Sequence, residues 1–140
     1  MNKFFTSTYP IINLYKKNSI KSEIVTQMIY GESFSIIKKS KKWLKIKIKE
    51  DNYKGFIINR KFSTFIKPTH KIHILKAKIY KFSNKKKVID QLSFGSKIRV
   101  LGRKGKFYKF SNGWIDRINV KPIAYKEKDL LKKIIIFKNI

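Results

Sequence analysis

Few side chains in this 140-residue sequence could perform covalent or metal chemistry. It contains no cysteine, which excludes disulfides, thiolate metal sites and a cysteine nucleophile within these residues. His70 and His73 lie three positions apart, a spacing that can bind metal on a helix, but Pro68 precedes them and a strand pattern follows. No phosphate-binding glycine loop or Ser-His-Asp arrangement is recognisable, and "GRKG" at 102–105 predicts a turn. We therefore expect no catalysis by this chain, no metal and no cofactor.

Charge is the most conspicuous feature of the composition, with 35 basic residues, 8 acidic residues and a formal net charge of +27. Such an excess suggests nucleic-acid binding, because basic side chains neutralise phosphates. Only four of the cations are arginines, however, and the lysines of "KWLKIKIK" alternate with apolar residues as on the solvated face of a strand. We expect a solvated basic surface, and nucleic-acid binding stays an alternative.

The beginning of the chain, "MNKFFTSTYPIINLYKK", lacks the sustained apolar core of a secretory signal. No apolar run approaches the roughly 20 residues that a membrane-spanning helix needs. We expect a cytoplasmic monomer without a membrane span.

Short alternating patterns predict an all-β region up to about residue 122. "WLKIKIK", "SFSIIKK", "KIRVLGR" and "FYKFSN" fit strands of four to seven residues separated by turns. The tail "YKEKDLLKKIIIFKNI" changes period and predicts a C-terminal helix, with one apolar face formed by Leu130, Leu131, Ile134 and Ile135.

An internal repeat indicates two units of similar plan. At a fixed offset of 64 positions, Gln27 matches Gln91 and Gly31 matches Gly95, and apolar residues from Val25 to Ile46 recur at the same offset. "GFI" at 55–57 matches "GWI" at 113–115 at an offset of 58. We predict that the matched apolar positions form the two cores, namely Val25, Phe34, Ile36, Trp43 and Ile46 in one and Ile89, Ile98, Val100, Phe107 and Phe110 in the other.

Three segments of the first unit carry a family resemblance: "SEIVTQMIYGE" at 22–32, "KKWLKIKI" at 41–48 and "DNYKGFI" at 51–57. They resemble the bacterial type of Src-homology-3 (SH3) domain, and more narrowly the tandem pair that precedes the catalytic domain of NlpC-type cysteine peptidases. The second unit resembles this pattern more loosely, through "IDQLSFGSKIRVL" and "GWI".

The resemblance implies two tandem small SH3-like β-barrels followed by a helix. The first barrel would cover residues 1–66 and the second 77–122, with a linker at 67–76. Residues 123–140 would form the helical tail and the start of a missing catalytic domain. We expect both Trp43 and Trp114 to lie in a core or between the barrels rather than in a ligand groove.

In the family that this chain resembles, the cysteine domain cleaves murein peptides after γ-D-glutamyl residues, and the first barrel forms one wall of the cleft. An acidic residue and a tyrosine there hold the free amino end of the peptide, and the matching positions are Glu23 and Tyr53. The competing interpretations are that Glu23 is an ordinary surface acid and that Tyr53 packs beside Gly55, while the turn residue Glu32 is a weaker candidate. The implied role is non-catalytic recognition and scaffolding, with a stand-alone wall-binding module as a further alternative.

Overall fold

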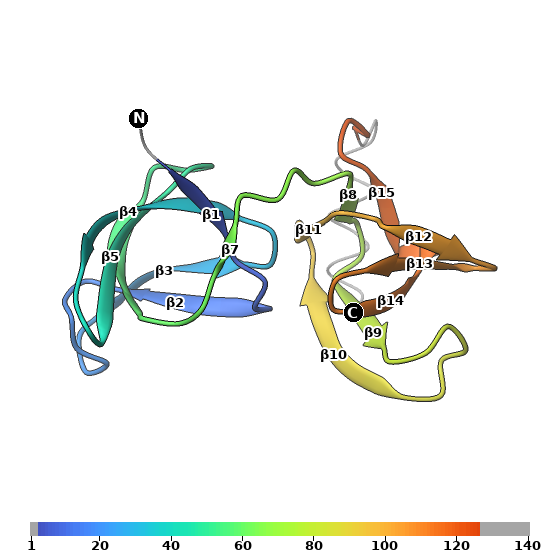
Figure 1. Ribbon diagram of the computed structural model, residues 1–140, viewed down its shortest axis with the longest axis horizontal. Helices are drawn as coiled ribbons and strands as arrows, with labels where there is room; N and C mark the ends of the chain where they lie inside the picture. The colour runs from blue at the N-terminus through green and yellow to red at the C-terminus, as the bar shows by residue number, and fades with distance from the viewer. Residues whose placement is uncertain (1–2, 127–140) are drawn as a thin grey trace.

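The computed structural model describes residues 3–126, and within that range the chain is all-β apart from one short 3₁₀ turn. A seven-stranded antiparallel sheet occupies the first half (Figure 1). Its strand order is β3-β2-β6-β5-β4-β1-β7. Its strands are β1 (Phe4–Thr6), β2 (Ile11–Tyr15), β3 (Ile24–Ile29), β4 (Ser33–Lys39), β5 (Trp43–Ile48), β6 (Lys54–Ile58) and β7 (Ser63–Thr64).

The second half forms two sheets. One has the order β10-β9-β14-β13-β12 and the other the order β11-β8-β15. Their strands are β8 (His70–Ile72), β9 (Lys76–Tyr80), β10 (Val88–Ser93), β11 (Lys97–Ile98), β12 (Gly102–Lys104), β13 (Phe107–Phe110), β14 (Gly113–Asp116) and β15 (Val120–Pro122), with the 3₁₀ turn η1 at Arg117–Asn119. Residues 70–72, expected in a connector, are therefore a strand. The predicted C-terminal helix lies outside the described residues from position 127 onward.

The two halves share one plan of strand pairing. Strand β3 matches β10 at the offset of 64 found in the sequence, and both following turns contain a glycine with positive φ, 86° at Gly31 and 87° at Gly95. The equivalence extends to the outer strands, which sequence comparison did not reach. Phe5 of β1 pairs with Phe34 of β4 in the same way that His70 of β8 pairs with Ile98 of β11. In the same way β7 pairs with β1, and β15 with β8.

Each half has its own apolar core, because alternate residues of the strands point inward. In β5, Leu44, Ile46 and Ile48 are buried while the lysines between them are half-exposed. Of the ten predicted core residues, Phe34, Ile46, Ile98, Phe107 and Phe110 are buried. Ile36 and Val100 are partly buried and pack against the cores.

Val25 and Ile89 were predicted to be core residues, and this was wrong: their side chains are 36% and 44% exposed. The pairing of β2 with β3 shifts between Leu14 and Tyr15, and Val25 is the residue left over. The pairing of β9 with β10 shifts in the same way and leaves Ile89 over. Both residues therefore lie in equivalent β-bulges, where the simple alternation of inward and outward side chains is interrupted.

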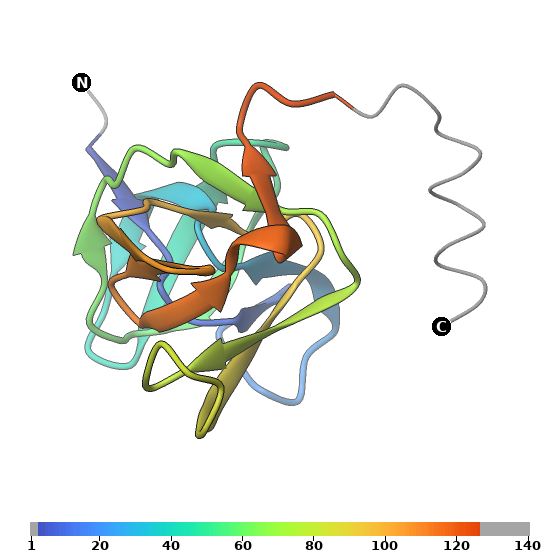
Figure 2. The ribbon, with the colours of Figure 1, turned by 90° about the vertical axis from the view of Figure 1, so that its right-hand side faces the viewer.

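The halves pack against each other through the turn after β3. Tyr30 comes from the first half, yet its side chain is buried in the core of the second, where its ring packs edge-on against Phe110 at 5.8 Å. Its hydroxyl donates to Asn112 Oδ1 at 2.7 Å. The Lys97 amide donates to the Tyr30 carbonyl at 2.9 Å, and a Cβ on Gly31 would overlap the Lys97 carbonyl. Figure 2 views the molecule with one half in front of the other.

Candidate functional site

Glu23 stands at the residue before β3, and its side chain is exposed. Its backbone carbonyl accepts a hydrogen bond from the Lys16 amide at 2.8 Å, which ties it to the end of β2. Within the described part of the chain, no hydrogen bond or ion pair engages its carboxylate. The carboxylate is therefore available to a cationic group of a ligand.

Tyr53 stands at the residue before β6, and its side chain is 53% exposed. Within residues 3–126 only its backbone forms hydrogen bonds: its amide donates to Asp51 Oδ1 at 3.0 Å and its carbonyl accepts from the Ile48 amide at 2.9 Å. Asn52, in the left-handed region with φ of 62°, completes the turn. Such exposure shows that the Tyr53 side chain is not part of the core.

Glu23 and Tyr53 immediately precede β3 and β6, the two strands that flank β2 in the sheet. Tyr15 pairs with Phe56, so the following residue, Lys16, lies level with Gly55. Because Lys16 also bonds to Glu23, the register places Glu23 and Tyr53 at the same end of the sheet. The fold thus brings together two residues that are 30 positions apart in the sequence.

Trp43 was predicted to lie in a core or between the barrels, but it is half-buried on the outer face of the first sheet. Its ring packs edge-on against Tyr15, with centroids 5.9 Å apart, and Lys45 Nζ lies 5.8 Å from the centre of the Phe56 ring. A hollow of about 330 Å³ is lined by Asn18, Lys38, Ser40, Trp43, Lys45 and Phe56. The sequence did carry the signal, because the alternation of "WLKIKIK" places the tryptophan on the lysine face.

An equivalent aromatic cluster exists in the second half. Tyr80 packs edge-on against Phe107 at 6.0 Å, and Lys109 Nζ lies 5.3 Å from the centre of the Trp114 ring. Tyr80 and Phe107 are only 8% and 7% exposed. The second cluster is therefore more closed than the first, in which Tyr15 and Trp43 are both half-buried.

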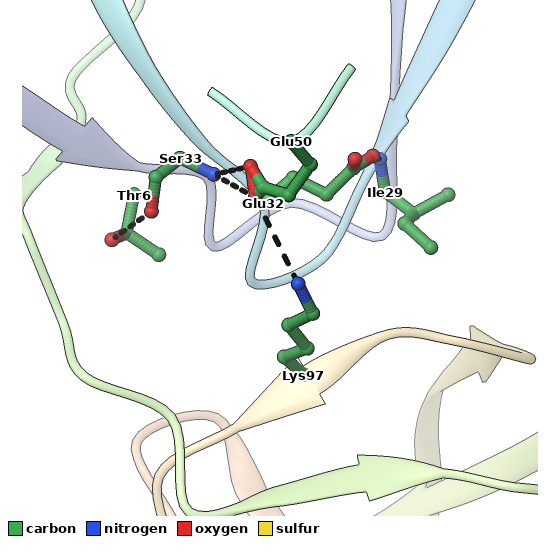
Figure 3. Close-up of polar contacts among 6 residues, drawn as sticks. All are labelled: Thr6, Ile29, Glu32, Ser33, Glu50 and Lys97. Carbon is green, nitrogen blue, oxygen red and sulfur yellow. Dashed lines mark hydrogen bonds and ion pairs between the residues drawn. The ribbon is translucent and has the colours of Figure 1, made fainter. Parts of the chain in front are cut away.

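Two further carboxylates lie where the halves meet (Figure 3). Glu50 accepts hydrogen bonds from the Ser33 amide at 3.0 and 3.2 Å and faces Lys97 Nζ at 3.9 Å. Glu32 accepts one from the Ile29 amide at 2.8 Å. Burial, more than the neighbouring negative charges of Glu50 and Asp51, raises the pKa of Glu32. The Glu32 carboxylate accepts a hydrogen bond from within its own turn, and this favours a structural role.

The histidines each contact protein groups. His70 Nδ1 lies 2.8 Å from Thr69 Oγ1, its ring lies against Tyr108, and burial lowers its pKa. His73 Nε2 lies 2.9 Å from the Ile118 carbonyl oxygen. Residues 3–126 contain no cluster of three or more His, Asp or Glu side chains that could hold a metal ion. Nor does that part of the chain contain a helix long and apolar enough to cross a membrane.

Glu23 and Tyr53 both lie within a segment that matches a known family model. Residues 14–60 match the family model described as the bacterial dipeptidyl-peptidase SH3 domain. For this part of the chain, the match bears out the SH3 resemblance that the sequence motifs predicted. A search of curated proteins found no match.

A solved structure shares the architecture beyond this module. A crystal structure of an NlpC/P60 family protein from Bacillus cereus ATCC 10987 matches 96% of this chain with a TM-score of 0.72 and 14% sequence identity. The matched region spans 63% of that protein, so this chain corresponds to part of its length. NlpC2 from Trichomonas vaginalis matches 92% of the chain and 49% of its own length, with a TM-score of 0.36 and 14% identity. At 14% identity, the likeness to the Bacillus cereus protein is one of fold alone.

Proposed function

We propose that this chain is the non-catalytic recognition and scaffolding region of a murein-peptide hydrolase of the NlpC cysteine-peptidase type. In this proposal its two halves are tandem SH3-like barrels, at residues 1–66 and 77–122. The observation that carries the proposal is the match of residues 14–60 to a peptidase SH3 domain. That segment includes both Glu23 and Tyr53, whose exposed side chains lie at one end of its sheet.

Recognition would rest on simple complementarity. The Glu23 carboxylate would pair with the free ammonium group of a murein-derived peptide, a charge-assisted interaction that an acetylated end cannot make. The Tyr53 phenol would add a hydrogen bond and an apolar wall. Cleavage itself would require a cysteine domain, because this sequence has no cysteine.

Scaffolding would rest on the way the two halves pack. The buried Tyr30 ring and its hydrogen bonds to Ser111 and Asn112 join the first half to the core of the second. A barrel held in this way presents its recognition residues in a fixed orientation, which reduces the entropy lost on binding.

The test uses a protein in which this region is joined to its catalytic domain. Glu23→Gln preserves the shape and removes the charge, so we expect a loss of at least about tenfold in kcat/KM for peptides with a free amino end. Acetylated peptides should change little. Glu50→Gln is unsuitable as a control because Glu50 binds Ser33, whereas exposed Asp90, in the second half, supplies the control Asp90→Asn. Equal losses on both substrates would contradict the role of Glu23.

Nucleic-acid binding is the alternative, favoured by the net charge of +27 and by the contact of half-exposed Lys45 with half-exposed Phe56. Lysines beside accessible aromatic rings suit single-stranded nucleic acids, in which bases stack on aromatic side chains. Non-specific complexes have Kd values of about 10⁻⁴ to 10⁻⁶ M at physiological salt. Nanomolar binding of random DNA or RNA under these conditions would favour this alternative, whereas capture by intact murein would favour a stand-alone wall-binding module.

A further inference from the structure

A cleft in the second half gathers basic side chains away from Glu23 and Tyr53. Its volume is about 510 Å³, and it is lined by Lys85, Lys106, Tyr108, Asp116, Arg117 and Ile118. The walls come from the loop before β10, the β12–β13 turn, β13, the end of β14 and η1. None of the groups assigned to peptide recognition contributes to it.

Two contacts hold the Arg117 guanidinium group at this cleft. Nη1 donates to the Gly105 carbonyl at 3.3 Å, and the group lies over the Tyr108 ring at 5.7 Å. Its Nε is buried without a hydrogen-bond partner, and among the described residues no other buried side-chain nitrogen or oxygen lacks one. A buried N–H group without an acceptor costs free energy, so an acceptor supplied by a ligand would relieve that cost.

The charges around the cleft favour a dianion. Lys85 Nζ pairs with Asp116 Oδ2 at 3.2 Å, and Asp116 Oδ1 accepts from the Ile118 amide at 3.1 Å. This carboxylate offsets one of the three cations and leaves Lys106 and Arg117 with two positive charges. A phosphate monoester carries close to two negative charges at neutral pH, and guanidinium groups match the geometry of its oxygens.

We propose that this cleft binds a phosphate monoester. The phosphoryl oxygens would lie between Arg117 and Lys106, and a movement of the guanidinium group would present the Nε–H to them. The rest of the ligand would lie along Tyr108 and Ile118, whose side chain is 74% exposed. This site does not depend on the peptide-recognition role, because it uses other residues in the other half of the chain.

The experiment is a titration of the ¹⁵N-labelled full chain with phenyl phosphate at physiological salt, followed by NMR. We expect saturable shifts confined to residues around the cleft, and a Kd at least about tenfold higher for Arg117→Gln, since charge-assisted hydrogen bonds are stronger than neutral ones. Lys106→Gln should also weaken binding, and since Lys106 is exposed this variant tests the site even if Arg117→Gln fails to fold. Arg103→Gln removes the same charge from an exposed position outside the cleft and should leave the Kd unchanged.

Three results would overturn the proposal. If Arg103→Gln weakened the binding of phenyl phosphate as much as the cleft variants do, the ligand would be attracted by net charge alone. Benzoate binding as tightly as phenyl phosphate would show that the cleft does not select the phosphoryl dianion. Tighter binding of dimethyl phosphate would contradict the charge matching and indicate a phosphodiester as the ligand.

Discussion

Single residues in this chain take their roles from which face of a sheet they occupy. Trp43 belongs to the lysine face of β5, and Val25 belongs to a bulge, although both are large apolar residues in strands. Glu23 and Tyr53 keep their side chains exposed while their backbones anchor the sheet. The position of Glu32 has a measurable consequence for stability, because burial raises the pKa of its carboxyl group.

A raised pKa means that the folded state binds the Glu32 proton more tightly than the unfolded chain does. The free energy of unfolding should therefore fall as the pH rises from about the ordinary value of 4.5 through the higher folded-state pKa, and no further above it. Glu32→Gln keeps an oxygen that can accept from the Ile29 amide and removes the titration. We expect this variant to lose less stability than the wild type over that pH window.

Urea unfolding of both proteins at pH 4 to 8 measures this difference. Asp90→Asn, at an exposed carboxylate of the second half, provides the control and should parallel the wild type. Parallel curves for Glu32→Gln and the wild type would show that burial of Glu32 has no effect on stability.

At the scale of elements, the two halves repeat not only strands but also their irregularities. The bulges at Val25 and Ile89 are equivalent, and so are the positive-φ turns at Gly31 and Gly95. The surroundings of these two glycines differ. A Cβ at Gly31 would overlap the Lys97 carbonyl, whereas one at Gly95 would lie 3.6 Å from Ile29 Cδ1, an ordinary contact.

This difference makes Gly31→Ala and Gly95→Ala a matched pair. Both substitutions place alanine in the left-handed region, which costs about 1–2 kcal/mol. Gly31→Ala must in addition displace Lys97 and weaken the packing between the halves, so we expect it to cost clearly more than Gly95→Ala. Chemical denaturation of the two variants tests the ranking, and equal losses would mean that the contact with Lys97 can relax freely.

At the scale of the whole molecule, the two cores are coupled through Tyr30. Its ring completes the apolar core of the second half, although Tyr30 lies in the turn after β3 of the first half. Lys97 reinforces the same boundary from the second half, through the Tyr30 carbonyl and the Glu50 carboxylate. Unfolding one half would therefore expose part of the other.

Tyr30→Ala should destabilise the chain by about 3–5 kcal/mol, in the range of large-to-small substitutions of buried aromatic residues. Tyr30→Phe should cost less, because it keeps the ring and loses only the hydroxyl contacts with Ser111 and Asn112. In the Tyr30→Ala variant, backbone amides of β13 and β14 as well as those of β3 should lose protection from hydrogen exchange. Loss confined to β3 would show that the halves unfold independently.

The sequence by itself determined the all-β character, the repeat and the likeness of the first half to a peptidase SH3 domain. These features follow from local information, because the alternation of strand residues and the positions of turn residues can be read directly from the sequence. The recurrence of Gly31 at Gly95 and of "GFI" as "GWI" revealed the repeat without reference to any packing.

Only the tertiary structure decided which apolar residues are buried and how the halves meet. A bulge changes the face on which later side chains lie, so Val25 and Ile89 could not be placed by periodicity. Tyr30 enters a core made of residues more than 40 positions later, and the cleft around Arg117 collects residues from 85 to 118. Such neighbours depend on long-range packing, and no local pattern in the chain encodes them.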